Sequence, residues 1–199
     1  MSRRVVLDDD EMARALTRMA HQILESGRGS EELVLLGIPT RGVPLAERLA
    51  EQLRRIEAAN GVEIDPAEMT GSLDITMFRD DLRRGRVKMP SPTRIPPRGV
   101  DGRTVVLVDD VLSTGRTIRA ALDAVSSVGR PRAVRLAVLV DRGHRELPIR
   151  PDYVGKNLPS ARSERIHVEL REIDGADRVV IASGDDGDES GSSNTTREA

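Results

Sequence analysis

The feature that most constrains the fold is a short run of strand-forming residues, Thr104 to Val108, followed by a helical pattern from Thr117 to Val128. A strand without charged residues is typically one whose two faces are both buried within the protein. Ala133 to Val140 repeats the pattern. Strands that alternate with helices predict parallel βαβ units. We therefore expect an α/β fold, an open, mainly parallel twisted sheet flanked by helices, with ligands at the carboxyl ends of its strands.

The N-terminal third of the chain fits the same pattern. Asp8 to Ser26 begins with acids and predicts an amphipathic helix, since its apolar residues recur at helical spacing: Met12, Leu16, Met19 and Ile23. Leu33 to Leu36 predicts a strand, and Gly37 to Gly42 a loop. The helix expected next has one apolar face, formed by Leu45, Leu49 and Leu53.

Further strands are expected at three places, 73–78, 166–170 and 178–182. In the first segment apolar and polar residues alternate, and strand-forming residues are frequent. It is followed by a basic segment from Arg79 to Arg98 that contains Pro90, Pro92, Pro96 and Pro97. Prolines remove backbone donors from a sheet, so this segment predicts a long mobile loop.

Composition favours one soluble domain, residues 1–182, followed by a disordered acidic tail, residues 183–199. The chain has 199 residues, of which 38% are hydrophobic and 32% charged. The tail contains five acids, one base and no sizeable apolar side chain, so it cannot compensate its ordering entropy. No apolar run approaches the ~20 residues that cross a bilayer, and we expect a cytoplasmic protein. With no cysteine and three scattered histidines, any metal is expected to bind oxygen ligands.

The loop after residue 108 combines two kinds of binding group. Asp109 and Asp110 offer carboxylates that accept hydrogen bonds from vicinal sugar hydroxyls. Thr114, Gly115 and Thr117 stand where the next helix begins, and free amides and hydroxyls there suit a phosphate monoester. A ribose 5-phosphate fits this order of groups. The alternative is an acid pair beside an ordinary helix cap, which explains the Ser-Thr-Gly sequence but not two adjacent acids after an apolar strand.

This segment resembles the phosphoribosyl-pyrophosphate (PRPP) motif of type I phosphoribosyltransferases. The resemblance implies that Asp109 and Asp110 are catalytic residues that bind the ribose hydroxyls. It implies that the substrate is also bound along the rest of the motif, at Val111, Leu112, Ser113, Thr114, Gly115, Arg116 and Thr117. The family's pyrophosphate loop falls at Pro39 to Gly42, which assigns Thr40 to binding and Arg41 to binding and catalysis. Ser113 departs from the tyrosine that is frequent in the family.

The resemblance narrows to family members that act on uracil and also regulate pyrimidine operons, and it covers nearly the whole body of the chain. Its most specific stretch is Asp141 to Arg150. It implies that uracil and PRPP give UMP and diphosphate, with Mg²⁺ carried by PRPP rather than bound directly. It also implies substrate contacts at Arg79, in a loop that closes over the site, and uracil near Arg142 and Ile166. A homodimer or higher homo-oligomer is expected.

The same resemblance implies a second ligand, the pyrimidine-operon messenger RNA. Candidate RNA-binding residues are basic or polar and lie on the outer face of the first helix or in later basic segments: Thr17, Arg18, His21, Arg28, Arg145, Arg150 and Lys156. A solvated charged face is the simpler interpretation. Two wider alternatives also stay open, an RNA-binding regulator whose PRPP and UMP pocket is mainly a sensor, and a transferase for another base.

Overall fold

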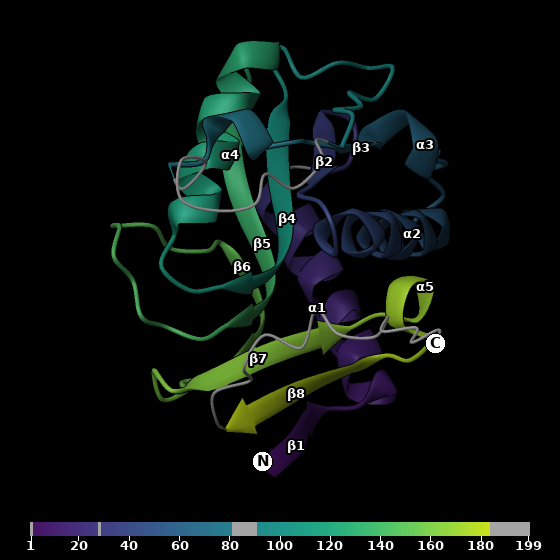
Figure 1. The fold of residues 1–199 in the computed structure, drawn as a ribbon. Coiled ribbons are helices and arrows are strands. Elements are labelled where there is room, and N and C mark those ends of the chain that lie inside the picture. The colour runs from purple at the N-terminus through teal and green to yellow at the C-terminus, as the bar shows by residue number, and fades with distance from the viewer. Residues whose placement is uncertain (1, 28, 81–90, 184–199) are drawn as a thin grey trace, which may run out of the picture.

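The computed structural model describes residues 2–27, 29–80 and 91–183. A parallel sheet occupies the upper part of Figure 1, with its five strands in the order β3-β2-β4-β5-β6. The strands are β2 (Leu33–Gly37), β3 (Thr70–Ser72), β4 (Thr104–Leu112), β5 (Ala133–Asp141) and β6 (Tyr153–Asn157). All four pairings are parallel, which confirms the predicted α/β fold.

Helices cover both faces of the parallel sheet. On one face α1 (Asp9–Gly27) and α2 (Gly42–Ala59) pack in a cluster that contains Leu35 and Val106. On the other face α4 (Arg116–Val128) packs in a cluster that contains Leu36 and Leu107. Successive strand side chains therefore enter opposite clusters, which explains the continuous apolar runs in the middle of these strands. A short helix, α3 (Pro66–Met69), precedes β3.

A second sheet of three strands lies below the first in Figure 1 and is antiparallel, in the order β1-β8-β7. Its strands are β1 (Ser2–Leu7), β7 (Glu164–Glu169) and β8 (Arg178–Ser183), and α5 (Arg171–Asp174) joins β7 to β8. We call these four elements the hood. Leu7, Val168 and Val179 of the hood belong to the same apolar cluster as α1 and α2. Two of the hood strands were predicted, whereas β1 and the edge strand β6 of the parallel sheet were not.

The prediction of a strand at residues 73–78 is wrong. The described strand is β3, and Thr76–Phe78 forms a short 3-10 helix, η1. The Asp74 carboxylate accepts hydrogen bonds from the Thr76 backbone N–H at 3.0 Å and from the Thr76 hydroxyl at 2.6 Å. This local bond turns the chain, and alternation in the sequence does not reveal it.

Part of the predicted mobile loop lies outside the described residues, as do the predicted tail from residue 184 and Arg28. The described end of the loop is attached to β3, since Ser72 and Arg94 exchange two backbone hydrogen bonds of 2.9 and 2.8 Å. Within the described ranges, no helix is both long and apolar enough to span a bilayer.

Candidate active site

Two adjacent carboxylates lie near the carboxyl end of β4. Asp109 is buried, and its Oδ1 accepts a hydrogen bond of 2.9 Å from the Asp110 backbone N–H. Asp110 is half-buried, and its Oδ1 accepts one of 2.8 Å from the Val111 N–H. The strand continues to Leu112, so these acids stand within it rather than after it. Their orientation is thus fixed by the backbone of the strand that carries them.

Burial raises the pKa of the Asp109 carboxyl well above its usual value, and the neighbouring charge of Asp110 raises it further. The positive charge of Arg79 acts in the opposite direction. Arg79, predicted to bind substrate, therefore lies within electrostatic reach of the acid pair. A buried carboxyl with a raised pKa in a cleft is a frequent sign of a functional site.

The turn after β4 contains a glycine in a left-handed conformation and is hydrogen-bonded to a neighbouring loop. Gly115 precedes α4 with φ of 94°, a left-handed conformation that glycine adopts readily. The Thr114 carbonyl accepts backbone hydrogen bonds from Glu146 and Leu147 at 3.0 and 3.2 Å. The N-terminus of α4 thus follows directly on the predicted phosphate-binding residues, an arrangement suited to an anion.

Arg145 fastens this turn to the strand beside it. Its guanidinium donates to the carbonyls of Ser113 and Ile149, each at 2.8 Å, and to the Asp141 carboxylate at 2.6 Å. Arg145 was predicted to bind RNA, and that role stays a prediction. In the described structure its side chain supports the phosphate turn, a role that the sequence did not reveal.

Arg116 belongs to the same predicted motif, but its guanidinium pairs with acids on the surface. It donates to the carboxylates of Asp80 at 2.7 Å and Glu146 at 2.8 Å. Its backbone N–H contributes to the turn instead, through a hydrogen bond of 3.3 Å to the Thr114 hydroxyl.

The predicted pyrophosphate loop, Pro39 to Gly42, packs directly against β4. A Cβ atom on Gly42 would lie 2.3 Å from the Val108 carbonyl oxygen, so only glycine allows this approach. The peptide bond between Pro39 and Thr40 is cis. Thr40 is exposed, and Arg41 is the N-cap residue immediately before α2. The loop and the acid pair therefore meet at one end of the sheet, as the sequence predicts.

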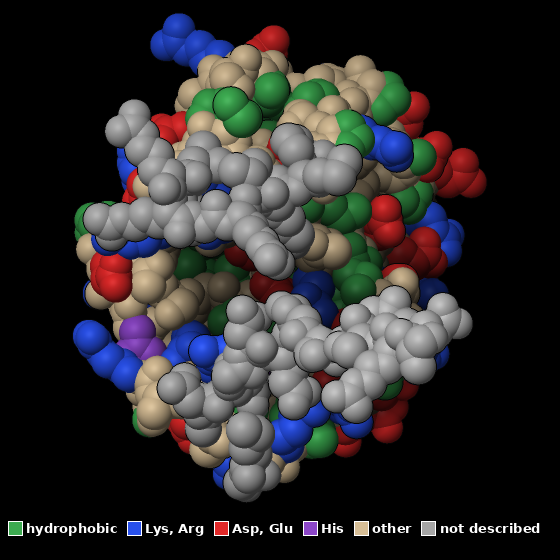
Figure 2. Space-filling model, in the orientation of Figure 1, with side chains coloured by type: hydrophobic (Ala, Val, Ile, Leu, Met, Phe, Trp, Pro, Cys, Tyr) green, Lys and Arg blue, Asp and Glu red, His purple; other side chains and the backbone are tan. Residues whose placement is uncertain are grey.

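The hood closes the other side of a cleft of about 290 Å³. Its lining includes Asp110 and Arg41 from the side of the parallel sheet and Ile166 to Glu169 from β7, which is an edge strand of the hood sheet. Figure 2 shows acidic and basic side chains next to each other in the hollow between the two layers. Ile166, predicted to lie near the base, is thus brought to the same cleft as Asp110.

Arg142 stands outside the lining of this cleft. Its guanidinium donates to the Ser160 hydroxyl at 3.1 Å and to the carbonyls of Ala161 and Glu164 at 3.1 and 2.9 Å. The predicted base contact of Arg142 is not tested. The structure shows that it ties the end of β5 to the start of β7.

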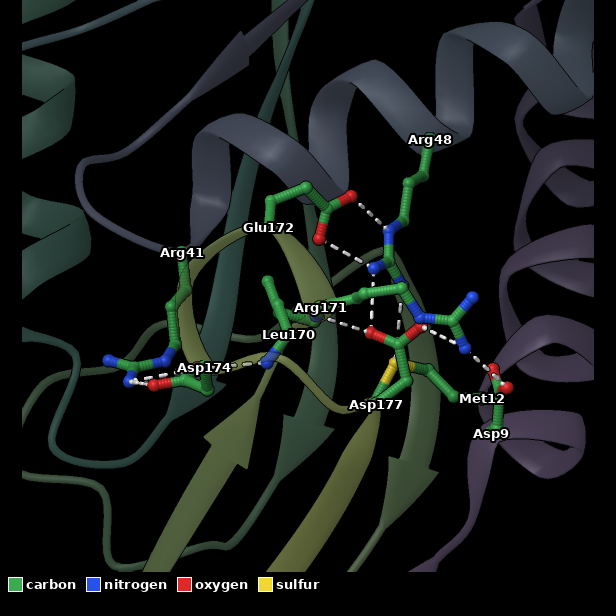
Figure 3. A network of polar contacts seen from close by, with 9 residues as sticks. All are labelled: Asp9, Met12, Arg41, Arg48, Leu170, Arg171, Glu172, Asp174 and Asp177. Atoms are coloured by element: carbon green, nitrogen blue, oxygen red, sulfur yellow. Dashed lines mark hydrogen bonds and ion pairs between the residues drawn. The ribbon is translucent and has the colours of Figure 1, made fainter.

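Arg41 meets the hood across the cleft, as Figure 3 shows. Its Nη2 lies 2.9 Å from Oδ1 and 3.2 Å from Oδ2 of Asp174, while its buried Nε has no partner among the described residues. A hydrogen bond from the Leu170 N–H and the charge of Arg41 lower the pKa of Asp174. Sequence reasoning missed Asp174, which is separated from Arg41 by 133 positions.

The predicted RNA-binding residues gather in part at one surface. Arg18 on α1 donates to the carbonyls of Val154 and Gly155 at 3.1 and 2.5 Å, which brings it beside exposed Lys156 on β6. His21 is exposed on the same helix, whereas Thr17 is half-buried and donates to the Ala13 carbonyl. Arg150 is exposed on a separate loop.

Residues 4–172 match the phosphoribosyl transferase domain family. The chain is also 63% identical over 185 residues to the bifunctional protein PyrR of Leifsonia xyli, a match that covers 92% of this chain and 99% of the relative. The chain belongs to the PyrR family of phosphoribosyltransferases. The PyrR protein of Streptomyces coelicolor is 58% identical, with 89% of each chain covered.

Solved structures agree with the PyrR family's fold. The hypoxanthine phosphoribosyltransferase of Trypanosoma cruzi superposes with a TM-score of 0.65 at 18% identity, over 92% of this chain and 97% of that one. A hypoxanthine-guanine phosphoribosyltransferase from Bacillus anthracis gives a TM-score of 0.60 at 17% identity, over 78% and 84% of the two chains. At these identities the similarity concerns the fold alone.

Proposed function

We propose that the chain is a uracil phosphoribosyltransferase that converts uracil and PRPP to UMP and diphosphate. The observation that carries the proposal is the position of Asp109 and Asp110, at the carboxyl end of β4 between the Pro39 to Gly42 loop and the turn before α4. Ribose hydroxyls fit the acids, and the 5-phosphate fits the turn. Membership of the PyrR family supports uracil as the base.

Each part of the site contributes to displacement at the anomeric carbon of PRPP. The acid pair and the turn from Ser113 to Thr117 hold the ribose 5-phosphate, which leaves the anomeric carbon to face the cleft. Arg41 and the N–H groups of its loop stabilise the charge of the departing pyrophosphate. The free edge of β7 at Ile166 offers backbone groups that hold uracil in line for attack.

Magnesium fits this site only together with the substrate. No group of three or more potential metal ligands occurs among the described His, Asp and Glu residues. Mg²⁺ commonly keeps several waters and binds substrate phosphates, so it would enter on PRPP, and Asp109 and Asp110 would remain available to the ribose hydroxyls. Bound in this way, the ion would offset the negative charge of pyrophosphate.

A panel of bases tests the proposed reaction. Purified protein is mixed with PRPP and Mg²⁺ and then with uracil, orotate or hypoxanthine, and released pyrophosphate is measured. Uracil alone should give turnover. Turnover with hypoxanthine alone would replace uracil by a purine as the substrate, and a protein that binds PRPP but turns over no base would contradict catalysis.

We propose in addition that the protein binds pyrimidine-operon RNA in response to uridine nucleotides. The supporting observation is the surface where Arg18 and His21 of α1 meet Lys156 of β6. Few aromatic side chains exist for base stacking, since aromatic residues make up 1% of the chain. Phosphate contacts and polar contacts to loop bases would therefore dominate, and the affinity would depend steeply on salt.

Arg18→Ala separates this RNA-binding role from catalysis. The change should weaken binding to a hairpin RNA from the operon leader and leave UMP formation unchanged, because Arg18 lies outside the cleft. Glu25→Ala, at an exposed acid of the same helix, is the matched control. Wild-type RNA affinity should rise when UMP is added. Equal affinity with and without UMP would contradict nucleotide control.

A further inference from the structure

Two arginines seven positions apart bind the hood (Figure 3). They are Arg41, the N-cap residue of α2, and Arg48 within the helix. Seven residues make two helical turns, so both side chains leave the same face of α2. Arg48 donates to Glu172 at 2.8 and 2.6 Å and to Asp177 at 2.6 Å. Both arginines thus attach the short segment around α5 to the helix that follows the pyrophosphate loop.

The two attachments differ in where they lie. Arg41 and Asp174 both line the cleft that contains Asp110, whereas Arg48, Glu172 and Asp177 do not. Asp177 is almost fully enclosed, with 7% of its side chain exposed. The Arg48 attachment is therefore away from any substrate in the cleft, and the Arg41 attachment is inside it.

The Arg41 attachment also differs in geometry. One nitrogen, Nη2, approaches both oxygens of Asp174, so the pair lacks the two parallel bonds of a fork-to-fork contact, while Arg48 reaches Glu172 through Nε and Nη2 in that manner. About a third of the Arg41 side chain is exposed, 33%, against 22% for Arg48. Arg41 is thus the more exposed of the two arginines, and it has one acidic partner where Arg48 has two.

The Arg41 pair affects the binding of PRPP, so this inference rests on the proposed function. Phosphate oxygens and carboxylates compete for the same guanidinium donors. A pyrophosphate group at the Pro39 to Gly42 loop would approach an arginine already paired with Asp174, and it would also meet the negative charge of that carboxylate. Both effects oppose binding.

We propose that Asp174 is a substrate-displaced latch. Its carboxylate holds Arg41 in the free protein and gives Arg41 up when the pyrophosphate group of PRPP binds. The hood stays attached through Arg48 while the latch opens. Asp174 is thus a positioning residue that sets the affinity for PRPP by competing for Arg41.

The test compares Asp174→Asn with Asp177→Asn by titration calorimetry, with PRPP and with inorganic pyrophosphate, both in Mg²⁺ buffer. Both variants remove one negative charge from the same hood segment. Asparagine at 174 keeps an oxygen that can accept from the Leu170 N–H, so the turn is retained. Asp174→Asn should bind both ligands about two- to fivefold more tightly, the range expected for the loss of one partly exposed ion pair. Asp177→Asn should show no gain.

A gain in affinity is informative because damage to the fold would weaken binding instead. Combining Asp174→Asn with Arg41→Ala should abolish the gain, since no guanidinium is left to release. Unchanged or weaker binding by Asp174→Asn, or an equal gain in Asp177→Asn, would overturn the latch. A wild-type protein that binds PRPP but turns over no base would contradict the proposed reaction and leave the latch standing.

Discussion

The loop from Asp109 to Thr117 and the segment from Leu170 to Asp177 face each other across one cleft, but different forces fix them. Backbone hydrogen bonds and the buried strand β4 hold the loop, together with the half-buried Arg145. Ion pairs from α2 hold the hood segment, and they are partly exposed to solvent. The first arrangement is preorganised and less sensitive to salt, while the second can exchange partners.

This difference suggests that the two sides of the cleft, a rigid one at the Asp109 loop and an adjustable one at the hood segment, bind different parts of the substrates. The rigid side would bind the constant part of the substrates, ribose 5-phosphate. The adjustable side would respond to the groups that arrive and leave, pyrophosphate and the base.

Asp110→Asn should have the largest effect. A neutral amide accepts weaker hydrogen bonds from ribose hydroxyls than a carboxylate does, so UMP formation should fall about 10- to 100-fold. The asparagine oxygen can keep the bond from the Val111 N–H, so the melting temperature should change little. Steady-state rates and thermal unfolding measure the two quantities. Wild-type activity in this variant would show that the rigid side does not bind ribose.

The two sides also differ in how well the sequence predicts them. Asp109 to Thr117 is contiguous, and its strand, turn and helix each leave a local pattern, so the site on this side was predicted. The partners of Arg41 and Arg48 are more than 120 positions away, and no local pattern joins them. The wrong strand at 73–78 has a related cause, because a single side-chain bond from Asp74 overrides the alternation around it.

Arg145→Met should have the next largest effect. It removes the bonds to Ser113 and Asp141 but keeps a side chain of similar length, so the phosphate turn loses its brace. Leaving a half-buried carboxylate without its partner costs about 1–3 kcal/mol, and PRPP affinity should fall about tenfold. Arg150→Met, at an exposed arginine of the same loop, is the control. Equal affinities for the two variants would mean that the turn is rigid without Arg145.

Asp109→Asn should stabilise the free protein at neutral pH although it impairs PRPP binding. The pKa of Asp109 is raised by burial above the value of about 3.9 for an unfolded aspartate. Between these two pKa values the folded state binds more protons, so stability falls as the pH rises through that window. Asparagine buries no charge, and the melting temperature at pH 7 should rise by about 2–4 °C, the shift that ~1 kcal/mol gives in a chain of this size.

A pH series measures this gain. It should shrink as the pH falls toward 4, because the folded wild-type carboxyl is then protonated and no charge is buried. A gain of equal size at pH 4 and pH 7 would mean that burial of charge is not its cause.

Glu172→Gln should have the smallest effect and the strongest dependence on salt. Arg48 lowers the pKa of Glu172, so the ionised pair stabilises the hood above the pH at which an unfolded glutamate titrates. Nearly half of the glutamate side chain, 45%, is exposed, so solvent screening limits the loss to about 0.2–1 kcal/mol. Thermal unfolding in low salt should show this loss. In 1 M NaCl, where the screening length is about 3 Å, the variant and wild type should unfold at the same temperature. A loss that persists in high salt would mean that packing, rather than charge, fixes the hood, and the contrast with the Asp109 loop would disappear.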